Sequence, residues 1–590
     1  MPDQTPPNQV VFTNKAQCRD CYRCLRVCPV KAIRIHNGQA VVEASRCISC
    51  GTCIRECPQG AKSFRNDLEC ATRLLSEGGG VAASVAPSFV AVFSEWERRR
   101  LPSALRKLGF SYVGETAIGA FPVARETAAV AAARGSQPTI CTACPACVSY
   151  VERYQPEMVD LLAPVVSPML AHAKHIKDKL GANTKVIFIG PCVAKKAEAD
   201  RPENAGLVDC VITFAELAQW LEREGISLSA LEESAFDEEP EGDARLFPIE
   251  GGSVRTADLS TDLLARDVVS VSGFEEFKQA LDNAASSDAP ILIEPLFCPQ
   301  GCINGPAITC DDNVYERRRD VLSYSEENQG REPGPETPAD LTARFSDQRV
   351  DRGEQPSEEA IRSVLEKTGK SKPEDQLNCG ACGYPSCRDK AIAVLRGMAE
   401  AEMCIPYMRR LAEQRTDKII ESSPNGIVIL DERLNIIHMN PAFRRFFMCS
   451  EAVLGKKISY LMDPDPWERL AAGDEELIET TVRHERYNLV THEILYPMRE
   501  ERQYVGIFVN ITNSQANERQ LGELRQQTVK QARELLEHQI RMAQQMAQAL
   551  GESTAQGERL VDNLLHLAGE DANTPREDGS GLPWDTSTSK

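Results

Sequence analysis

Two stretches near the start of the chain decide its first fold: CRDCYRCLRVCP at residues 18–29 and CISCGTCIRECP at residues 47–58. Both have the spacing C-x2-C-x2-C-x3-C-P. Three cysteines at every third position of a tight loop present three thiolates to one face of an iron–sulfur cubane, and the fourth cysteine stands before a proline that ends the loop. Zinc also binds C-x2-C pairs, but two complete runs that both close with proline favour 4Fe–4S clusters.

This pattern resembles that of the two-cluster ferredoxins, so we expect a ferredoxin-like module at residues 8–65. In such modules the fourth cysteine of each run binds the cluster of the other run. The resemblance implies one cluster on Cys18, Cys21, Cys24 and Cys57, and a second on Cys47, Cys50, Cys53 and Cys28. Residues 32–43 between the runs predict a hairpin that turns at Asn37-Gly38. Two clusters on one small module conduct electrons, so the rest of the chain must supply the chemistry that they serve.

Composition sets the context for these clusters. A chain of 590 residues is too long for one core and predicts several domains. A net charge of −20 without a basic stripe argues against a nucleic-acid partner. The polar N-terminus lacks a signal sequence, and no run of 18 apolar residues predicts a membrane span. We therefore expect a cytoplasmic, oxygen-sensitive protein that uses its 22 cysteines mainly as thiolate metal ligands rather than as disulfides.

Residues 78–324 alternate short apolar strands with helical patterns, which predicts an α/β domain. Cysteines occur where predicted strands end. Cys144 lies in ICTACPACVSYVERY, Cys192 follows KVIFIGP, and Cys298 and Cys302 follow ILIEPLF. Ligands of α/β proteins bind at the carboxyl ends of strands. Four cysteines from three strand ends can thus converge on one cubane, which needs four thiolates.

These three segments resemble, in the same order, the three signature loops of the iron-only (FeFe) hydrogenases. CTACPAC at 141–147 is similar to TSCCPxW, residues 190–198 to MPCxxKxxE, and residues 294–305 to ExMACxGGCxxGG. The resemblance implies a six-iron active site. Its cubane would be held by Cys144, Cys192, Cys298 and Cys302. A diiron unit with CO and cyanide ligands would hang from Cys302, and Lys195 would donate to a cyanide.

The sequence departs from the family pattern at several positions around this site. The family's catalytic loop has two adjacent cysteines, of which the first relays protons; here that position is Ala143, which has no transferable proton. The family methionines are Gly190 and Leu296, and the loop-one tryptophan is Cys147. Glu126 is a candidate for a carboxylate on the proton path, although a solvated helix glutamate is the plainer interpretation. Cys141 and Cys147 are either free buried thiols or part of an altered cluster.

A hydrophilic stretch at 325–355 predicts a linker. Beyond it, LNCGACGYPSCRDKA and a later Cys-x-Pro resemble the small helical 4Fe–4S domain of several anaerobic electron-transfer proteins, and we expect this domain at 356–410. The resemblance implies a cluster on Cys379, Cys382, Cys387 and Cys404, with zinc as the alternative. Its position suggests that electrons, or redox information, pass towards the C-terminus.

Residues 419–447, IIESSPNGIVILDERLNIIHMNPAFRRFF, resemble the start of a PAS domain, which we place at 412–514. PAS folds are sensory and dimerising modules, but the fold alone names no ligand. Residues 516–569 carry a narrow apolar stripe typical of a coiled coil, with a single helix packed on the PAS domain as the alternative. Residues 570–590 are polar and predict a disordered tail. The fold class is therefore multidomain, α/β and α+β, with a C-terminal coiled coil.

Three functions fit these predictions. The first is a low-turnover hydrogen or redox sensor that signals through a PAS and coiled-coil homodimer to a separate kinase or phosphatase, because no ATP-binding motif follows the PAS region. The second is a catalytic hydrogenase subunit that exchanges electrons with ferredoxin or a partner dehydrogenase. The third is an electron-transfer scaffold without the diiron unit.

Overall fold

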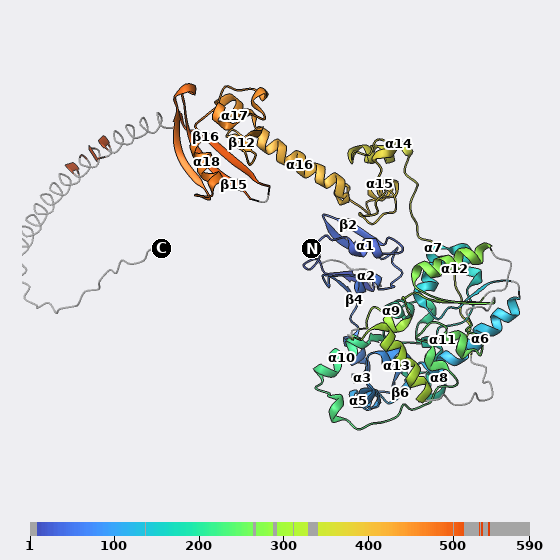
Figure 1. Ribbon diagram of the computed structural model, residues 1–590. Helices are drawn as coiled ribbons and strands as arrows, with labels where there is room; N and C mark the ends of the chain where they lie inside the picture. The colour runs from blue at the N-terminus through green and yellow to red at the C-terminus, as the bar shows by residue number, and fades with distance from the viewer. Residues whose placement is uncertain are drawn as a thin grey trace, which may run out of the picture. The chain divides into compact units, whose positions relative to one another are not determined.

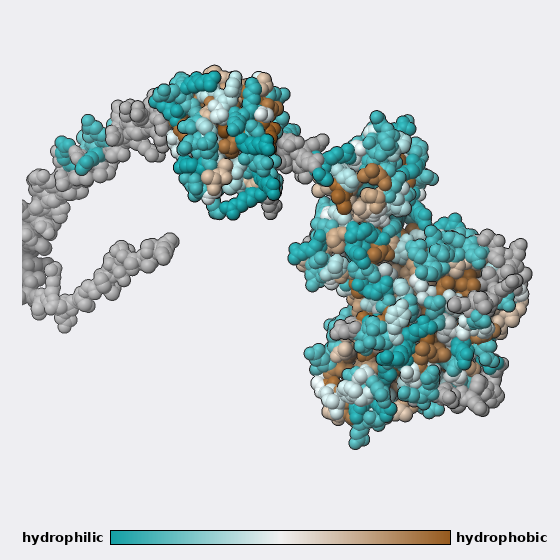
Figure 2. Space-filling model, viewed as in Figure 1, coloured by the Kyte–Doolittle hydropathy of each residue, from teal (hydrophilic) through white to brown (hydrophobic). Residues whose placement is uncertain are grey.

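The computed structural model describes residues 9–135, 137–262, 267–286, 292–308, 310, 312–327, 340–499 and 501–512, with seven scattered positions between 530 and 542. The chain divides into two units, Met1–Arg410 and Leu411–Lys590 (Figure 1). The predicted coiled coil and tail lie outside the described residues, apart from those scattered positions. Among the described helices, none combines the length and apolar character that a bilayer span requires. Hydrophilic residues dominate the visible face of both units in Figure 2.

The first module of unit one is a small ferredoxin-like fold. Strand β1 (Val11–Thr13) pairs with β4 (Lys62–Phe64), and β2 (Ile33–His36) pairs with β3 (Gln39–Val42), all antiparallel. Helices α1 (Arg23–Val27) and α2 (Thr52–Arg55) each follow two closely spaced cysteines and contain the third, Cys24 and Cys53. The hairpin prediction is confirmed: Asn37 and Gly38 both have positive φ, 50° and 75°, as a two-residue type I′ turn requires.

The hydrogenase-like domain contains two parallel sheets. The first has the order β6-β5-β8-β9, and the second has the order β10-β11-β7. Their strands are β5 (Val81–Val85), β6 (Tyr112–Glu115), β7 (Thr139–Ile140), β8 (Lys185–Gly190), β9 (Cys210–Thr213), β10 (Val268–Ser272) and β11 (Leu292–Leu296). All residues of β5 and β11 are buried. Such continuous apolar strands are expected where helices cover a parallel sheet.

Helices surround these sheets. Helix α8 packs against β5 and β8, and α3 and α10 pack against β9. The longer helices of the domain are α3 (Leu68–Ser76), α5 (Leu101–Leu108), α6 (Ala117–Arg134), α7 (Pro145–Tyr154), α8 (Pro168–Leu180), α10 (Phe214–Arg223), α12 (Phe274–Ser286) and α13 (Val314–Glu327). The shorter helices are α4 (Glu95–Arg98), α9 (Ala194–Ala199) and α11 (Gly252–Thr256).

The stretch predicted as a linker differs from that expectation in part. Helix α13 continues to Glu327, and residues 340–350 run along the hydrogenase-like domain. Val166 N donates to Leu341 O at 2.8 Å, and Val350 N donates to Arg153 O at 3.2 Å. The physical reason is that Leu341 and Val350, two apolar residues in a hydrophilic stretch, are both buried. The small domain that follows packs α14 (Glu358–Lys367) against α15 (Cys387–Leu395).

Unit two contains a five-stranded antiparallel sheet of the order β13-β12-β16-β15-β14. The strands are β12 (Gly426–Leu430), β13 (Ile436–Met439), β14 (Ile478–His484), β15 (Leu489–Met498) and β16 (Gln503–Asn510). Helix α16 (Ile405–Ser422) leads into the sheet, and α17 (Pro441–Phe446) and α18 (Asp465–Ala472) follow. The buried Asn440 side chain caps α17 by accepting from Phe443 N at 2.9 Å. The same oxygen accepts from Ile427 N at 2.8 Å, which fixes β12 beside the helix.

A buried lysine joins three elements of the hydrogenase-like domain. The Lys196 side chain is fully buried, and its Nζ donates to Asp67 Oδ2 at 2.8 Å, Val211 O at 2.8 Å and Glu216 Oε1 at 3.0 Å. Lys196→Met leaves the buried Glu216 without its cation, while Asp67 keeps only Arg65, so we expect a loss of about 3–5 kcal/mol in the free energy of unfolding. Lys185→Met, at a lysine that is 46% exposed, should cost less than about 1 kcal/mol. Chemical denaturation measures the free energy of unfolding of both variants. Equal losses in Lys196→Met and Lys185→Met would contradict the structural role of Lys196.

A buried histidine makes the same domain sensitive to acid. His172 has no accessible surface, and burial lowers its pKa from 6.5 to about 3. Below pH 6.5 the unfolded chain binds a proton that the folded chain does not, so stability falls as the pH is lowered towards 3, by at most about 1.4 kcal/mol per pH unit. His172→Gln should lose less stability than the unchanged protein between pH 6.5 and 4. Parallel stability curves for the two proteins would contradict the predicted role of His172.

Candidate metal centre

The four cysteines predicted to hold the cubane lie where strands of both sheets end. Cys144 precedes the first turn of α7 and follows β7 by four residues, and Cys192 stands two residues after β8. Cys298 follows β11 by two residues, and Cys302 opens a short 3-10 turn. The parallel strands explain this placement, since their carboxyl ends meet at one edge of each sheet.

These cysteines are brought together in the structure. Burial raises the pKa of Cys192 to about 11 and also raises the pKa values of Cys298 and Cys302. In each case the next cause is the charge of another cysteine of the set, and Cys144 acts on all three. Each of the four is partly buried and keeps some accessible surface. Four thiols that lie this close together can act as iron ligands, because coordination to a metal removes their protons.

Lys195 lies at the same site. Its Nζ donates to Glu198 Oε2 at 2.7 Å and to the carbonyl oxygen of Ala143 at 3.3 Å, and both charged side chains are about nine-tenths buried. Its charge lowers the pKa values of Cys192 and Cys302, which places the ammonium beside two thiols. An ammonium has three N–H donors, so one remains for a further acceptor. The sequence spacing i, i+3 on α9 was the signal that pairs Lys195 with Glu198.

The first loop contains Ala143, at the position where the hydrogenase loop that it resembles has its first cysteine. Ala143 lies between two fixed residues: Thr142 Oγ1 donates to Val165 O at 2.6 Å, and Cys144 begins α7. Cys147 is buried behind Cys144 and hydrogen-bonds its sulfur, which lowers the pKa of Cys144 to about 6. Cys141 is also buried, and burial raises its pKa to about 11. Glu126 is exposed on α6, as a solvated helix glutamate would be.

One buried carboxylate near the site was given no role by the sequence. Glu294 in β11 accepts from Gly251 N at 2.8 Å and from Ser253 N at 2.6 Å. Burial raises its pKa to about 7, and its charge acts on Cys141 and Cys302. The signal in the sequence was a single charged residue inside the apolar strand ILIEPLF, because such a residue needs buried partners.

Close backbone packing holds the third loop in place. Gly301 has φ of 89°, and a Cβ atom at this position would stand 2.3 Å from Pro248 O. A side chain would therefore force the loop between Cys298 and Cys302 away from the other two cysteines.

The ferredoxin-like module groups its cysteines as two sets. Charges of Cys18, Cys21 and Cys57 act on Cys24, and charges of Cys47, Cys50 and Cys28 act on Cys53. In the small domain, the charges of Cys382 and Cys404 act on the buried Lys390. Cys387 begins α15, and Cys379 is exposed.

Within the described residues, no three His, Cys, Asp or Glu side chains stand close enough together to hold a single metal ion. Sulfur ligands of one zinc ion lie about 2.3 Å from it and hence about 3.8 Å from each other. Thiolates at the corners of a cubane are separated by the cluster itself, so they do not need this spacing.

The three cysteine-containing modules of unit one contact one another in series. The small domain touches the ferredoxin-like module through Met398 O, which accepts from Ile35 N at 3.0 Å. The ferredoxin-like module touches the hydrogenase-like domain through Arg55 Nη1, which donates to Asn304 O at 3.3 Å. The Arg55 charge also lowers the pKa of Cys298, so the module reaches the edge of the four-cysteine site.

Fold and site together define a multidomain iron–sulfur protein. Residues 80–306 match the family described as iron only hydrogenase large subunit, C-terminal domain, and residues 10–58 match a 4Fe–4S dicluster domain. Residues 375–406 match a putative Fe–S cluster family, and residues 414–482 match a PAS domain. The chain therefore combines a region similar to the C-terminal domain of iron-only hydrogenase large subunits with regions similar to two further iron–sulfur families and to PAS domains.

Several curated proteins are similar to this chain. Iron hydrogenase 1 of Clostridium pasteurianum is 28% identical over 38% of this chain and 48% of its own length. The NADP-reducing hydrogenase subunit HndD of Solidesulfovibrio fructosivorans is 29% identical over 52% of this chain and 59% of its own. The cytosolic Fe–S cluster assembly factor NAR1 of Vanderwaltozyma polyspora is 41% identical over 15% of this chain and 17% of its own. The chain spans about half the length of the first two relatives.

Removing one thiolate tests whether the four cysteines hold iron. Cys298→Ala leaves the cysteines of the other modules intact, so we expect the anaerobically reconstituted variant to contain about four iron atoms fewer per chain than the unchanged protein. Iron analysis measures the difference. Cys449→Ala, which changes a thiol of the PAS domain, should retain the full iron content. Equal iron contents in the two variants would show that Cys298 is not a ligand.

Proposed function

We propose that this protein is a low-turnover sensor of hydrogen or redox state, whose six-iron site communicates through iron–sulfur clusters with the PAS domain. One observation carries the proposal: the four-cysteine site retains a buried lysine but presents Ala143 where a proton-relaying thiol would stand. A site of this kind can hold its cofactor and respond to it, while an alanine beside it cannot move protons quickly.

The residues present fit a cubane with an attached diiron unit. The four thiols supply the ligands of a cubane, and the Lys195 ammonium has a donor left for an anionic ligand such as cyanide. When bound, the diiron unit supplies the interconversion of two protons and two electrons with H2. Glu198 holds the ammonium in place and keeps its charge compensated in a buried setting.

The serial contacts of the three iron–sulfur modules support an electron route. The contacts at Arg55 and Met398 hold the ferredoxin-like module between the four-cysteine site and the small domain. Helix α16 begins at Ile405, directly after Cys404, and leads to the PAS sheet. A change in the charge of the last cluster can therefore act on the first turn of this helix. The PAS homodimer would carry the response to a separate kinase or phosphatase, and a ferredoxin or a hydrogenase subunit would supply electrons.

Two alternatives differ in the cofactor or in the rate. A catalytic hydrogenase subunit would contain the same cofactor and turn over rapidly. A scaffold without the diiron unit is favoured by the 41% identity over 87 residues with the NAR1 assembly factor. Infrared spectra of the anaerobically maturated protein separate these cases, because bound CO and cyanide absorb where protein does not. We expect the bands of both CO and cyanide. Their absence would exclude the sensor with a diiron unit and the catalytic subunit, and would favour the electron-transfer scaffold.

Restoring the thiol tests the role of position 143. In maturated protein, Ala143→Cys should raise hydrogen evolution by at least about tenfold, because general acid catalysis contributes factors of about 100 to 10,000. Ala143→Ser, whose hydroxyl is far less acidic, is the matched control and should change the rate little. Infrared spectra must show equal cofactor loading in all three proteins. Rapid turnover of the unchanged protein, with no gain in Ala143→Cys, would favour the catalytic subunit.

A further inference from the structure

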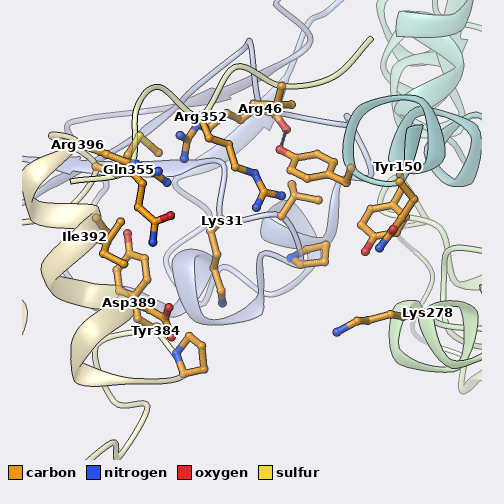
Figure 3. Close-up of a pocket in the computed structure, with 18 residues that line it drawn as sticks. Lys31, Arg46, Tyr150, Lys278, Arg352, Gln355, Tyr384, Asp389, Ile392 and Arg396 are labelled. Carbon is orange, nitrogen blue, oxygen red and sulfur yellow. Dashed lines mark hydrogen bonds between the residues drawn. The ribbon is translucent and has the colours of Figure 1, made fainter. Parts of the chain in front are cut away.

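A cavity of about 660 Å³ lies where three modules of unit one meet, close to the predicted cluster ligands Cys28 and Cys382 but not lined by them. Lys31 and Arg46 of the ferredoxin-like module, Tyr154 of the hydrogenase-like domain and Tyr384 of the small domain line it, together with Arg352 of the segment between the last two (Figure 3). No cysteine lines the cavity, so it is not space that a cluster would fill. Its volume is within the range of small-molecule sites, about 300–1,000 Å³.

The lining has a strong excess of positive charge in a chain of net charge −20. Five cations face the cavity and only one carboxylate, Asp389, does. The cations are Lys31, Arg46, Lys278, Arg352 and Arg396. In the part of the chain that the structure describes, none of these five forms an ion pair with a carboxylate. Uncompensated cations that converge from separate segments favour an anionic ligand.

Two polar groups in the wall lack partners. The hydroxyl of Tyr384, a residue only 6% exposed, has no hydrogen-bond partner among the described residues, and neither has the buried Nε of Arg396. Buried polar atoms are almost always paired, so an unpaired hydroxyl and an unpaired N–H on one cavity wall indicate a missing ligand. The charge of Arg46 acts on both Tyr384 and Tyr154, so its guanidinium is near both side chains.

Aromatic and amide groups accompany the cations. The guanidinium of Arg352 lies 5.6 Å from the centre of the Tyr154 ring, and Gln355 also lines the cavity. Arginine planes and tyrosine rings stack on nucleobases, and a side-chain amide can hydrogen-bond a base edge. Arginine forks and a lysine bind phosphate oxygens. We propose that this junction cavity binds a nucleotide, whose phosphates contact Lys31, Arg46 and Arg396 and whose base lies against the aromatic wall.

Such a ligand would bridge all three modules. Lys31 already donates to the carbonyls of Leu25 and Arg26 at 3.1 and 3.0 Å, so its ammonium is held in position without an acidic partner. A nucleotide in the cavity would tie the ferredoxin-like module and the small domain together and would stabilise the folded unit by its binding free energy. This inference does not depend on the diiron unit or on the proposed sensor function.

Calorimetric titration of the full, cluster-reconstituted chain with ATP, tripolyphosphate and adenosine tests the proposal. We expect one ATP per chain, bound at least about tenfold more tightly than either tripolyphosphate or adenosine, because each lacks one half of the contacts. Arg46→Gln should weaken ATP binding about tenfold, which is typical for one charge-assisted hydrogen bond. Tyr384→Phe should weaken it severalfold without lowering the melting temperature, because the lost hydroxyl has no partner within the protein.

Lys107→Gln is the matched control, because Lys107 is an exposed cation on α5 and does not line the cavity. It should bind ATP as the unchanged chain does. Tripolyphosphate binding as tightly as ATP would overturn the nucleotide assignment in favour of a plain polyphosphate site. Absence of ATP binding, or binding that Arg46→Gln and Tyr384→Phe leave unaltered, would overturn the cavity as the site.

Discussion

Convergence of cysteines from distant parts of the chain on one buried place is the constraint on which the structure depends. Parallel strands bring their carboxyl ends to the edges of two sheets, and the loops after β7, β8 and β11 carry Cys144, Cys192, Cys298 and Cys302 to one place. Burial raises the pKa values of three of these thiols, and the charges of their neighbouring cysteines raise them further, because the sulfurs lie close together inside the domain. The packing that positions these loops therefore also positions the four sulfurs that we expect to bind the metal.

The four-cysteine centre has a buried lysine beside it and an alanine, rather than a thiol, at position 143. Lys195 is compensated by Glu198 and still has a donor available, so the site can stabilise an anionic ligand at low dielectric. Ala143 stands next to it and offers neither acid nor base. Binding and proton delivery are separable tasks, and this chain retains the groups for the first while it lacks the usual group for the second. A sensor needs to bind its ligand and respond to it, whereas a rapid catalyst needs both ligand binding and fast proton delivery.

Local signals in the sequence were enough to find the modules. The spacing of cysteines identified both kinds of small iron–sulfur domain, Asn37-Gly38 fixed the hairpin, and strand-end cysteines indicated the central site. Contacts between distant residues were not predictable in this way. The burial of Leu341 and Val350 in a hydrophilic stretch, and the partners of Lys196, depend on surfaces that only the folded chain creates. The cationic cavity is of the same kind, because its wall comes from segments about 350 residues apart in sequence.

Anomalous diffraction at the iron absorption edge, from crystals of the anaerobically reconstituted protein, tests the central claim most directly. The account predicts a compact group of iron peaks enclosed by the sulfur atoms of Cys144, Cys192, Cys298 and Cys302, with the Lys195 ammonium beside it. Iron in the ferredoxin-like and small domains alone, with these four sulfurs packed against one another or pointing apart, would contradict it.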